Sequence, residues 1–143
     1  MSKRDAFYDE LFDGDSVPLS DDDEINVQNG RRLLGAALVG RMDNAIETAL
    51  STIDGDGEFA SMTDEQREAV RSLIRETASL MLFSTCSRLD QFPGFDLAIH
   101  LRTLPTDDPA MTDFAIASGD HDELHADYFD WIRDFSDHLA EDG

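Results

Sequence analysis

Lysine is almost missing from this chain, in which Lys3 is the only one among 143 residues. Positive charge is scarce in general: 11 Lys and Arg face 32 Asp and Glu, and the formal net charge is −21. A surface this negative repels nucleic-acid phosphates and anionic lipid headgroups at physiological salt. We therefore expect that the protein binds neither nucleic acid nor membranes directly.

Cysteine and long apolar runs are scarce too. Cys86 is the single cysteine, so no disulfide can form within the chain. The start, Met-Ser-Lys-Arg-Asp-Ala-Phe, lacks the apolar core of a secretion signal. No uncharged run approaches the ~18 apolar residues that a membrane-spanning helix needs. Together these absences favour a cytoplasmic protein.

The motifs of common enzymes are missing as well. The sequence has no glycine loop that would cradle a phosphate, no paired-cysteine metal knuckle and no nucleophile elbow. Active sites assembled from distant residues leave no such motif, so an enzyme stays an alternative. We expect a small acidic binding or regulatory protein that acts through protein–protein contacts, without catalysis and without a cofactor.

Three accounts of the acidity stay open, because arginine is kept while lysine is depleted. A salt-rich cytoplasm would screen self-repulsion, over about 3 Å at 1 M salt, and carboxylates would keep the surface hydrated. A high-GC genome would replace Lys by Arg. An anionic surface could instead engage a protein with a basic surface or imitate a nucleic-acid backbone. Self-association of the chain is also left open.

The chain has enough apolar material for one folded domain. Hydrophobic residues make up 41% of it, nine of them Phe, and its length suits a single domain. Residues 1–24 carry nine acids and are expected to form a flexible acidic arm in front of a helical domain at 25–143. Within the arm, Phe7, Leu11 and Phe12 share one side of a helical turn. They either cover the edge of the core or form an interaction surface.

Three long helices are expected, near 30–53, 64–90 and 120–140. In the first, Gly35 and Gly40 should permit close approach by neighbouring helices, on sides about 140° apart. The second should begin with a capping box of Thr63 and Gln66. Its buried face is expected to follow the apolar positions Val70, Leu73, Ile74, Thr77, Leu80 and Met81 and to continue through Phe83 and Cys86 to Leu89.

Residues 95–118 permit two interpretations. Leu97, Ile99 and Leu101 alternate with more polar residues as in a strand, but the same stretch also has a helix-like apolar face, which is slightly favoured. A strand here would pair with residues 114–118. The predicted fold class is therefore mainly α, a small bundle of three to four helices, with a short β-hairpin between 95 and 118 as the α+β alternative.

Two groups of residues near the C-terminus are candidate sites. Asp127, Asp130 and Asp134 belong to an acidic stripe beside the apolar face of the last helix, which is either a solvated face or a surface that attracts a basic partner. His121 and His125 lie one helical turn apart, a spacing at which two imidazoles can share a divalent transition metal. A metal-dependent enzyme or metal-binding protein using this pair is the main alternative function.

Overall fold

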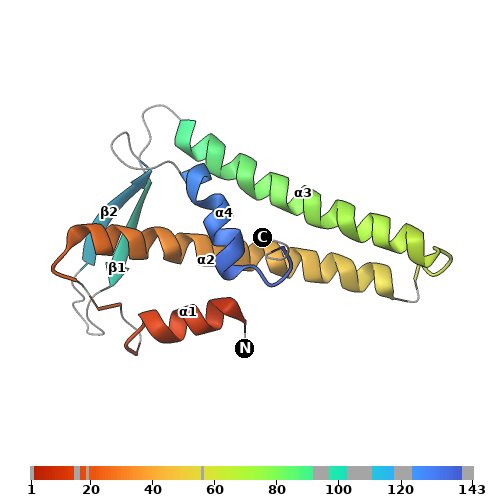
Figure 1. Ribbon diagram of the computed structural model, residues 1–143, viewed down its shortest axis with the longest axis horizontal. Helices are drawn as coiled ribbons and strands as arrows, with labels where there is room; N and C mark the ends of the chain where they lie inside the picture. The colour runs from red at the N-terminus through yellow and green to blue at the C-terminus, as the bar shows by residue number, and fades with distance from the viewer. Residues whose placement is uncertain are drawn as a thin grey trace.

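Among the residues that it describes, the computed structural model has four helices and one β-hairpin (Figure 1). It describes residues 2–14, 17–18, 20–55, 57–91, 97–102, 111–117 and 124–139. The predicted mainly α bundle is confirmed. The elements in chain order are α1 (Lys3–Leu11), α2 (Asp23–Asp54), α3 (Asp64–Gln91), β1 (Leu97–Arg102), β2 (Met111–Ala117) and α4 (Leu124–Phe135).

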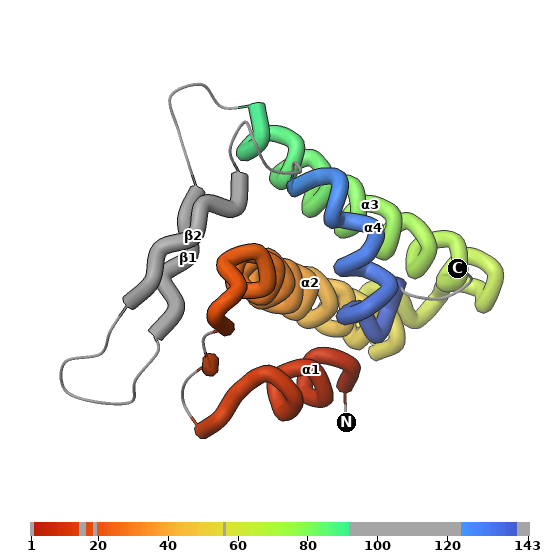
Figure 2. Tube along the Cα trace, turned by 60° about the vertical axis from the view of Figure 1, so that its left-hand side comes forward, coloured from red at the N-terminus to blue at the C-terminus, as the bar shows by residue number. Residues whose placement is uncertain are grey.

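The long helices α2 and α3 run antiparallel, and α4 packs against both of them (Figures 1 and 2). The apolar stripe expected on the last helix is found, since Leu124, Tyr128, Trp131 and Phe135 are all buried. The core that α4 shares with the other helices consists of Phe7, Ala36, Val39, Met42, Ile46, Leu82 and Cys86.

Helix α2 begins at residue 23, earlier than the predicted start near 30. The Asp22 carboxylate caps it by accepting the N–H of Glu24 at 2.9 Å. Asn26 is buried and exchanges two hydrogen bonds of 2.9 Å with the backbone of Ser20, which fixes the chain just before the helix. These polar contacts extend the helix beyond its apolar stripe.

Two of the three glycines of α2, Gly35 and Gly40, make room for neighbours, as predicted. A Cβ at Gly35 would lie 2.4 Å from ring carbons of Trp131 on α4, closer than any real contact allows. A Cβ at Gly40 would lie 3.1 Å from Nε of Arg4, which belongs to α1. The glycines therefore serve two different helices on two sides of α2.

The first residues of the arm fold onto the bundle as α1. A capping box of Ser2 and Asp5 starts this helix, and Phe7 is buried with its ring 4.8 Å from that of Phe135. Arg4 donates to Asp43 of α2 at 2.7 Å and to the carbonyl of Phe135 at 2.9 Å. Residues 3–11 thus contribute to the core, where the sequence predicts a separate arm.

The capping box predicted for α3 is present. Gln66 N–H donates to Oγ1 of Thr63 at 3.1 Å, and Thr63 N–H donates to Oε1 of Gln66 at 2.9 Å. The helix then runs to Gln91, one residue beyond the predicted end.

The helical interpretation is wrong for residues 97–102, the part of 95–104 that the structure describes, where the hairpin alternative is the one found. β1 and β2 pair antiparallel, from Leu97 opposite Ala117 to Arg102 opposite Met111, with an irregularity between Leu97 and Ala98. The period-two alternation therefore outweighs the helix-like spacing in this stretch.

Helix α4 does not reach the predicted end near residue 140. It ends at Phe135, because the Ser136 hydroxyl turns inward, donates to Asp43 at 2.8 Å and accepts the N–H of Leu139 at 2.9 Å. Residues 120–123 and 140 lie outside the described residues.

Candidate functional site

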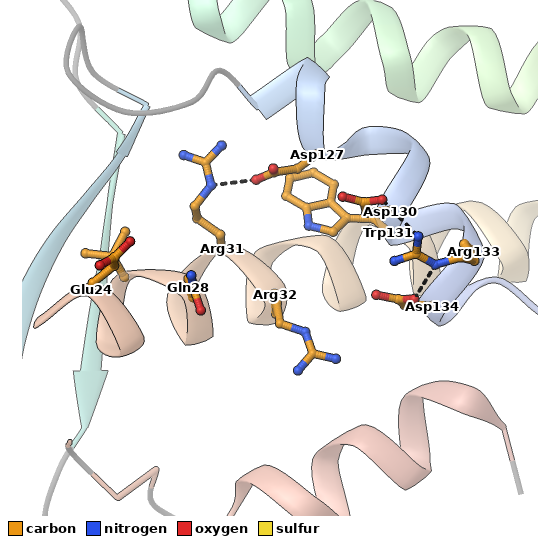
Figure 3. A pocket seen from close by; sticks show the side chains of 10 residues that line it. Glu24, Gln28, Arg31, Arg32, Asp127, Asp130, Trp131, Arg133 and Asp134 are labelled. Atoms are coloured by element: carbon orange, nitrogen blue, oxygen red, sulfur yellow. Dashed lines mark hydrogen bonds and ion pairs between the residues drawn. The ribbon is translucent and has the colours of Figure 1, made fainter. Parts of the chain in front are cut away.

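The predicted acidic stripe lines a cleft of about 320 Å³ between α2 and α4 (Figure 3). Trp131, which is buried, lies between the charged groups of the two helices. Three guanidinium groups and four carboxylates line the cleft, so it is close to neutral in a chain of −21. They belong to Arg31, Arg32, Arg133, Glu24, Asp127, Asp130 and Asp134.

Arginines of the same chain partly neutralise the stripe. Asp127 accepts a hydrogen bond from Nε of Arg31, and both side chains are largely buried. Arg133 pairs with Asp130 at 3.1 Å and with Asp134 at 2.9 Å, and the hydrogen bond to Asp134 raises the pKa of Arg133. Because of these ion pairs, the acidic stripe should attract a basic partner less strongly than its sequence suggests. Its role in recognition stays a prediction.

Stability should rise with salt, since the chain has 32 carboxylates and only 11 Lys and Arg, so that the carboxylates repel one another. We expect a higher midpoint of thermal unfolding in about 2 M KCl than in about 0.05 M KCl, with saturation once the Debye length falls below the charge spacing. The midpoint can be followed by circular dichroism. An unchanged or lower midpoint at high salt would remove the account that attributes the acidity to a salt-rich cytoplasm.

The aromatic patch predicted near the N-terminus is largely part of the core. Phe7 is buried, and the guanidinium carbon of Arg32 lies 4.7 Å from its ring centroid. Leu11 is half-buried and packs against the core, and Phe12 is half-buried with its ring 6.0 Å from that of Tyr8. The core-covering alternative therefore accounts for Phe7 and Leu11.

His125 is held by Asp90, a residue that the sequence alone does not single out. The Asp90 side chain is 1% exposed, and its oxygens accept the N–H groups of Leu124 at 2.7 Å and of His125 at 2.9 Å. The same carboxylate lies 2.7 Å from Nδ1 of His125. Asp90 on α3 thus caps the start of α4 and orients the imidazole.

The metal site predicted at His121 and His125 cannot be assembled from the described residues. His121 lies outside them, so its distance from His125 is not part of the structure. Across the described ranges, no group of three His, Cys, Asp or Glu side chains is placed to hold a metal ion.

Cys86 is the buried small residue that its spacing predicts, with no exposed surface. Burial raises the pKa of its thiol to about 11, and the carboxylates of Asp90 and Asp127 add to the shift. At neutral pH the group is a thiol and not the thiolate that acts as a nucleophile. The charge of Asp90 therefore opposes ionisation of this cysteine and does not activate it.

The buried face predicted for α3 is confirmed for Ile74, Phe83, Cys86 and Leu89, which pack into the core together with Ala78 and Leu82. It is wrong for Leu73, Leu80 and Met81, which are 60%, 58% and 67% exposed. The helix is therefore apolar on two sides, and only one of them is covered by α2 and α4.

We call the uncovered side the outer face of α3. Phe129 of α4 is also 68% exposed, but its ring lies 6.0 Å from that of Phe83, which packs toward the core. In both views α3 forms one edge of the molecule, with α2 and α4 on its inner side (Figures 1 and 2). The outer face consists of Gln66, Val70, Leu73, Thr77, Leu80, Ser84, Ser87 and Gln91.

Comparison with protein-family models, with curated proteins and with solved structures finds no match for this chain. Among the helices of the described ranges, none is long and apolar enough to cross a membrane. The outer face of α3 and the cleft between α2 and α4 are therefore judged on their geometry alone.

Proposed function

We propose that this protein is a small, non-enzymatic binding or regulatory protein that acts by contact with another protein molecule. The observation that carries the proposal is the outer face of α3, where large apolar side chains are more than half exposed. Soluble proteins rarely leave a contiguous apolar patch uncovered, and such patches mark interaction sites.

The outer face of α3 is a better candidate than the surfaces that the sequence suggests. The acidic residues of α4 are paired with Arg31 and Arg133, and Phe7 is buried in the core. The side chains of Leu73 and Leu80, by contrast, are exposed in the single chain and would be buried only by contact with a partner. Desolvating exposed apolar surface contributes about 25 cal/mol per Å², so these side chains can supply binding energy at no cost in internal contacts.

The partner follows from the charge of the chain. With a net charge of −21, the proposal excludes nucleic acids and anionic membranes as ligands. A cytoplasmic location belongs to the same proposal and rests on the single, buried cysteine.

A metal-dependent activity at His125 stays the alternative. The contact between Asp90 and Nδ1 of His125 favours it, since metal-binding histidines are commonly held by a carboxylate in this way. One tightly bound equivalent of zinc, manganese or iron in the purified protein would support this alternative.

The protein-contact proposal is tested by replacing Leu73 and Leu80 together with Gln. Because both side chains are more than half exposed and Gln is as good a helix former as Leu, the fold should be retained within about 0.5 kcal/mol. In native lysate the wild type should elute from a size-exclusion column above its monomer mass of 15.9 kDa. The double variant should elute as a monomer.

A matched control replaces Ala45 and Thr48, two exposed residues of α2, with Gln. This variant should elute like the wild type, because it changes a surface of similar exposure on a different helix. Elution of the wild type as a monomer at both low and high salt would contradict the proposal.

A further inference from the structure

We propose that the outer face of α3 is covered by a second copy of the chain, with the two α3 helices antiparallel across a two-fold axis. This inference rests on the proposed function and names the partner for the same surface. The residues that carry it are the eight of the outer face.

The spacing of the outer face is that of a coiled coil. Its eight positions alternate by four and three residues, and three of them, Val70, Leu73 and Leu80, are apolar while the other five are uncharged and polar. This 3.5-residue repeat keeps one seam of a helix facing a partner helix along its whole length. Leu82 and Leu89 lie on the far side of α3 and pack toward the core, so the seam points away from the rest of the chain.

In the antiparallel orientation, the outer face of one copy is complementary in shape to the outer face of the other. Antiparallel pairing about the middle of α3 places Leu73 opposite Ser84 and Thr77 opposite Leu80 of the other copy. Val70 then faces Ser87 in the same way. Each branched apolar side chain meets a small one, which is how facing helices interdigitate without voids or clashes. Because each contact occurs twice, the interface closes at a dimer.

The lack of charge on this face makes contact with a second copy possible. Two molecules of −21 repel each other, so their contact must be free of facing carboxylates. None of the eight outer-face residues is charged, and residues 77–87 contain no charged residue at all. The acidic residues of α3 lie beside the seam or at its ends and are Asp64, Glu65, Glu68, Glu76 and Asp90.

Charge favours the antiparallel orientation. The first turn of α3 carries Asp64 and Glu65, and its last turn carries Arg88. Antiparallel pairing brings the acidic first turn of one copy toward Arg88 of the other, and it opposes the two helix dipoles favourably. Parallel pairing would place the two acidic first turns together.

The expected dimer is weak and depends on salt. Stable interfaces bury about 800 Å² per partner, and a single pair of helices with few large apolar residues falls at the low end of that class. Screening of the repulsion between the two copies should therefore move the equilibrium toward dimer as KCl is raised.

A cysteine-trapping experiment tests this arrangement with purified protein. Leu73→Cys and Ser84→Cys are made separately in a Cys86→Ala background, so that each chain has one exposed thiol. In an antiparallel pair the thiol introduced at position 73 of one chain faces the thiol introduced at position 84 of the other. The two Cα atoms then lie within the roughly 7 Å that a disulfide requires. Two identical positions lie about 16 Å apart along the helix axis.

Mixing the two variants under mild oxidation at high KCl should give a disulfide-linked dimer, whereas each variant alone gives little. Thr48→Cys in the same background serves as the control for random collision. Linkage of each variant to itself with no excess in the mixture, or no linkage above the control, would overturn the inference. If the mixture fails to link but the Leu73 and Leu80 double variant still loses a complex in lysate, a different protein covers the face and the proposed function survives.

Discussion

The Trp131→Ala variant should lose about 3 to 5 kcal/mol of unfolding free energy, enough to unfold much of a domain of ordinary stability. Trp131 is 3% exposed and packs directly over Gly35, where α2 and α4 come closest. Alanine leaves a cavity that neither helix can fill. Urea unfolding followed by circular dichroism measures the loss, because the variant has no tryptophan fluorescence.

Gly35→Ala provides the matched test of this contact. In the wild type it should be destabilising by about 1 to 3 kcal/mol, because its Cβ would overlap the indole ring. In the Trp131→Ala background it should be neutral or stabilising, since Ala is the better helix former by about 1 kcal/mol. Equal effects of Gly35→Ala in both backgrounds would contradict the packing of Trp131 on α2.

The second large effect is expected at Asp43. Its side chain is 3% exposed and accepts hydrogen bonds from Arg4, the Ser136 hydroxyl and the N–H of Asp137, so it joins α1, α2 and the end of α4. Asp43→Ala removes the partner of a largely buried guanidinium and should cost about 3 to 5 kcal/mol. Urea unfolding at neutral pH measures this loss.

Asp54→Ala is the control for Asp43→Ala. Asp54 also pairs with an arginine, Arg71, but its side chain is 50% exposed. A surface ion pair of this kind contributes about 0 to 1 kcal/mol. A loss at Asp43 no larger than that at Asp54 would show that the buried network does not hold α1 to the bundle.

The sequence predicts the helices well where local signals exist. The Thr63–Gln66 capping box, the apolar stripe of α4 and the roles of Gly35 and Gly40 all depend on residues within one helix. The docking of α1 on the bundle, by contrast, depends on residues that lie far apart in the sequence. Arg4 and Asp43 are 39 residues apart, and no local pattern connects them.

The orientation of α3 could not be read from its periodicity. Leu73 and Leu80 recur at helical spacing, and so do Leu82, Cys86 and Leu89 on the opposite side. Both stripes satisfy the pattern of a buried face, so only the positions of α2 and α4 decide which one is inside. The stripe that these helices leave exposed is the outer face on which the proposed function rests.

The contacts of the candidate sites could not be predicted either, because they join residues that lie far apart in the sequence. The acidic stripe is visible in the sequence, but its partner Arg31 lies 96 residues from Asp127. Asp90 and His125 are 35 residues apart, so the capping of α4 by α3 leaves no local signal.

The most direct test of a contact surface on α3 is photo-crosslinking from position 80. A photoreactive residue in place of Leu80, irradiated in native lysate, should give a product that mass spectrometry identifies as a second copy of the chain joined through α3. The same residue in place of Thr48 on α2 should give little product. No product from position 80 above that from position 48 would contradict the account, because an exposed apolar face that meets no protein is not a binding surface.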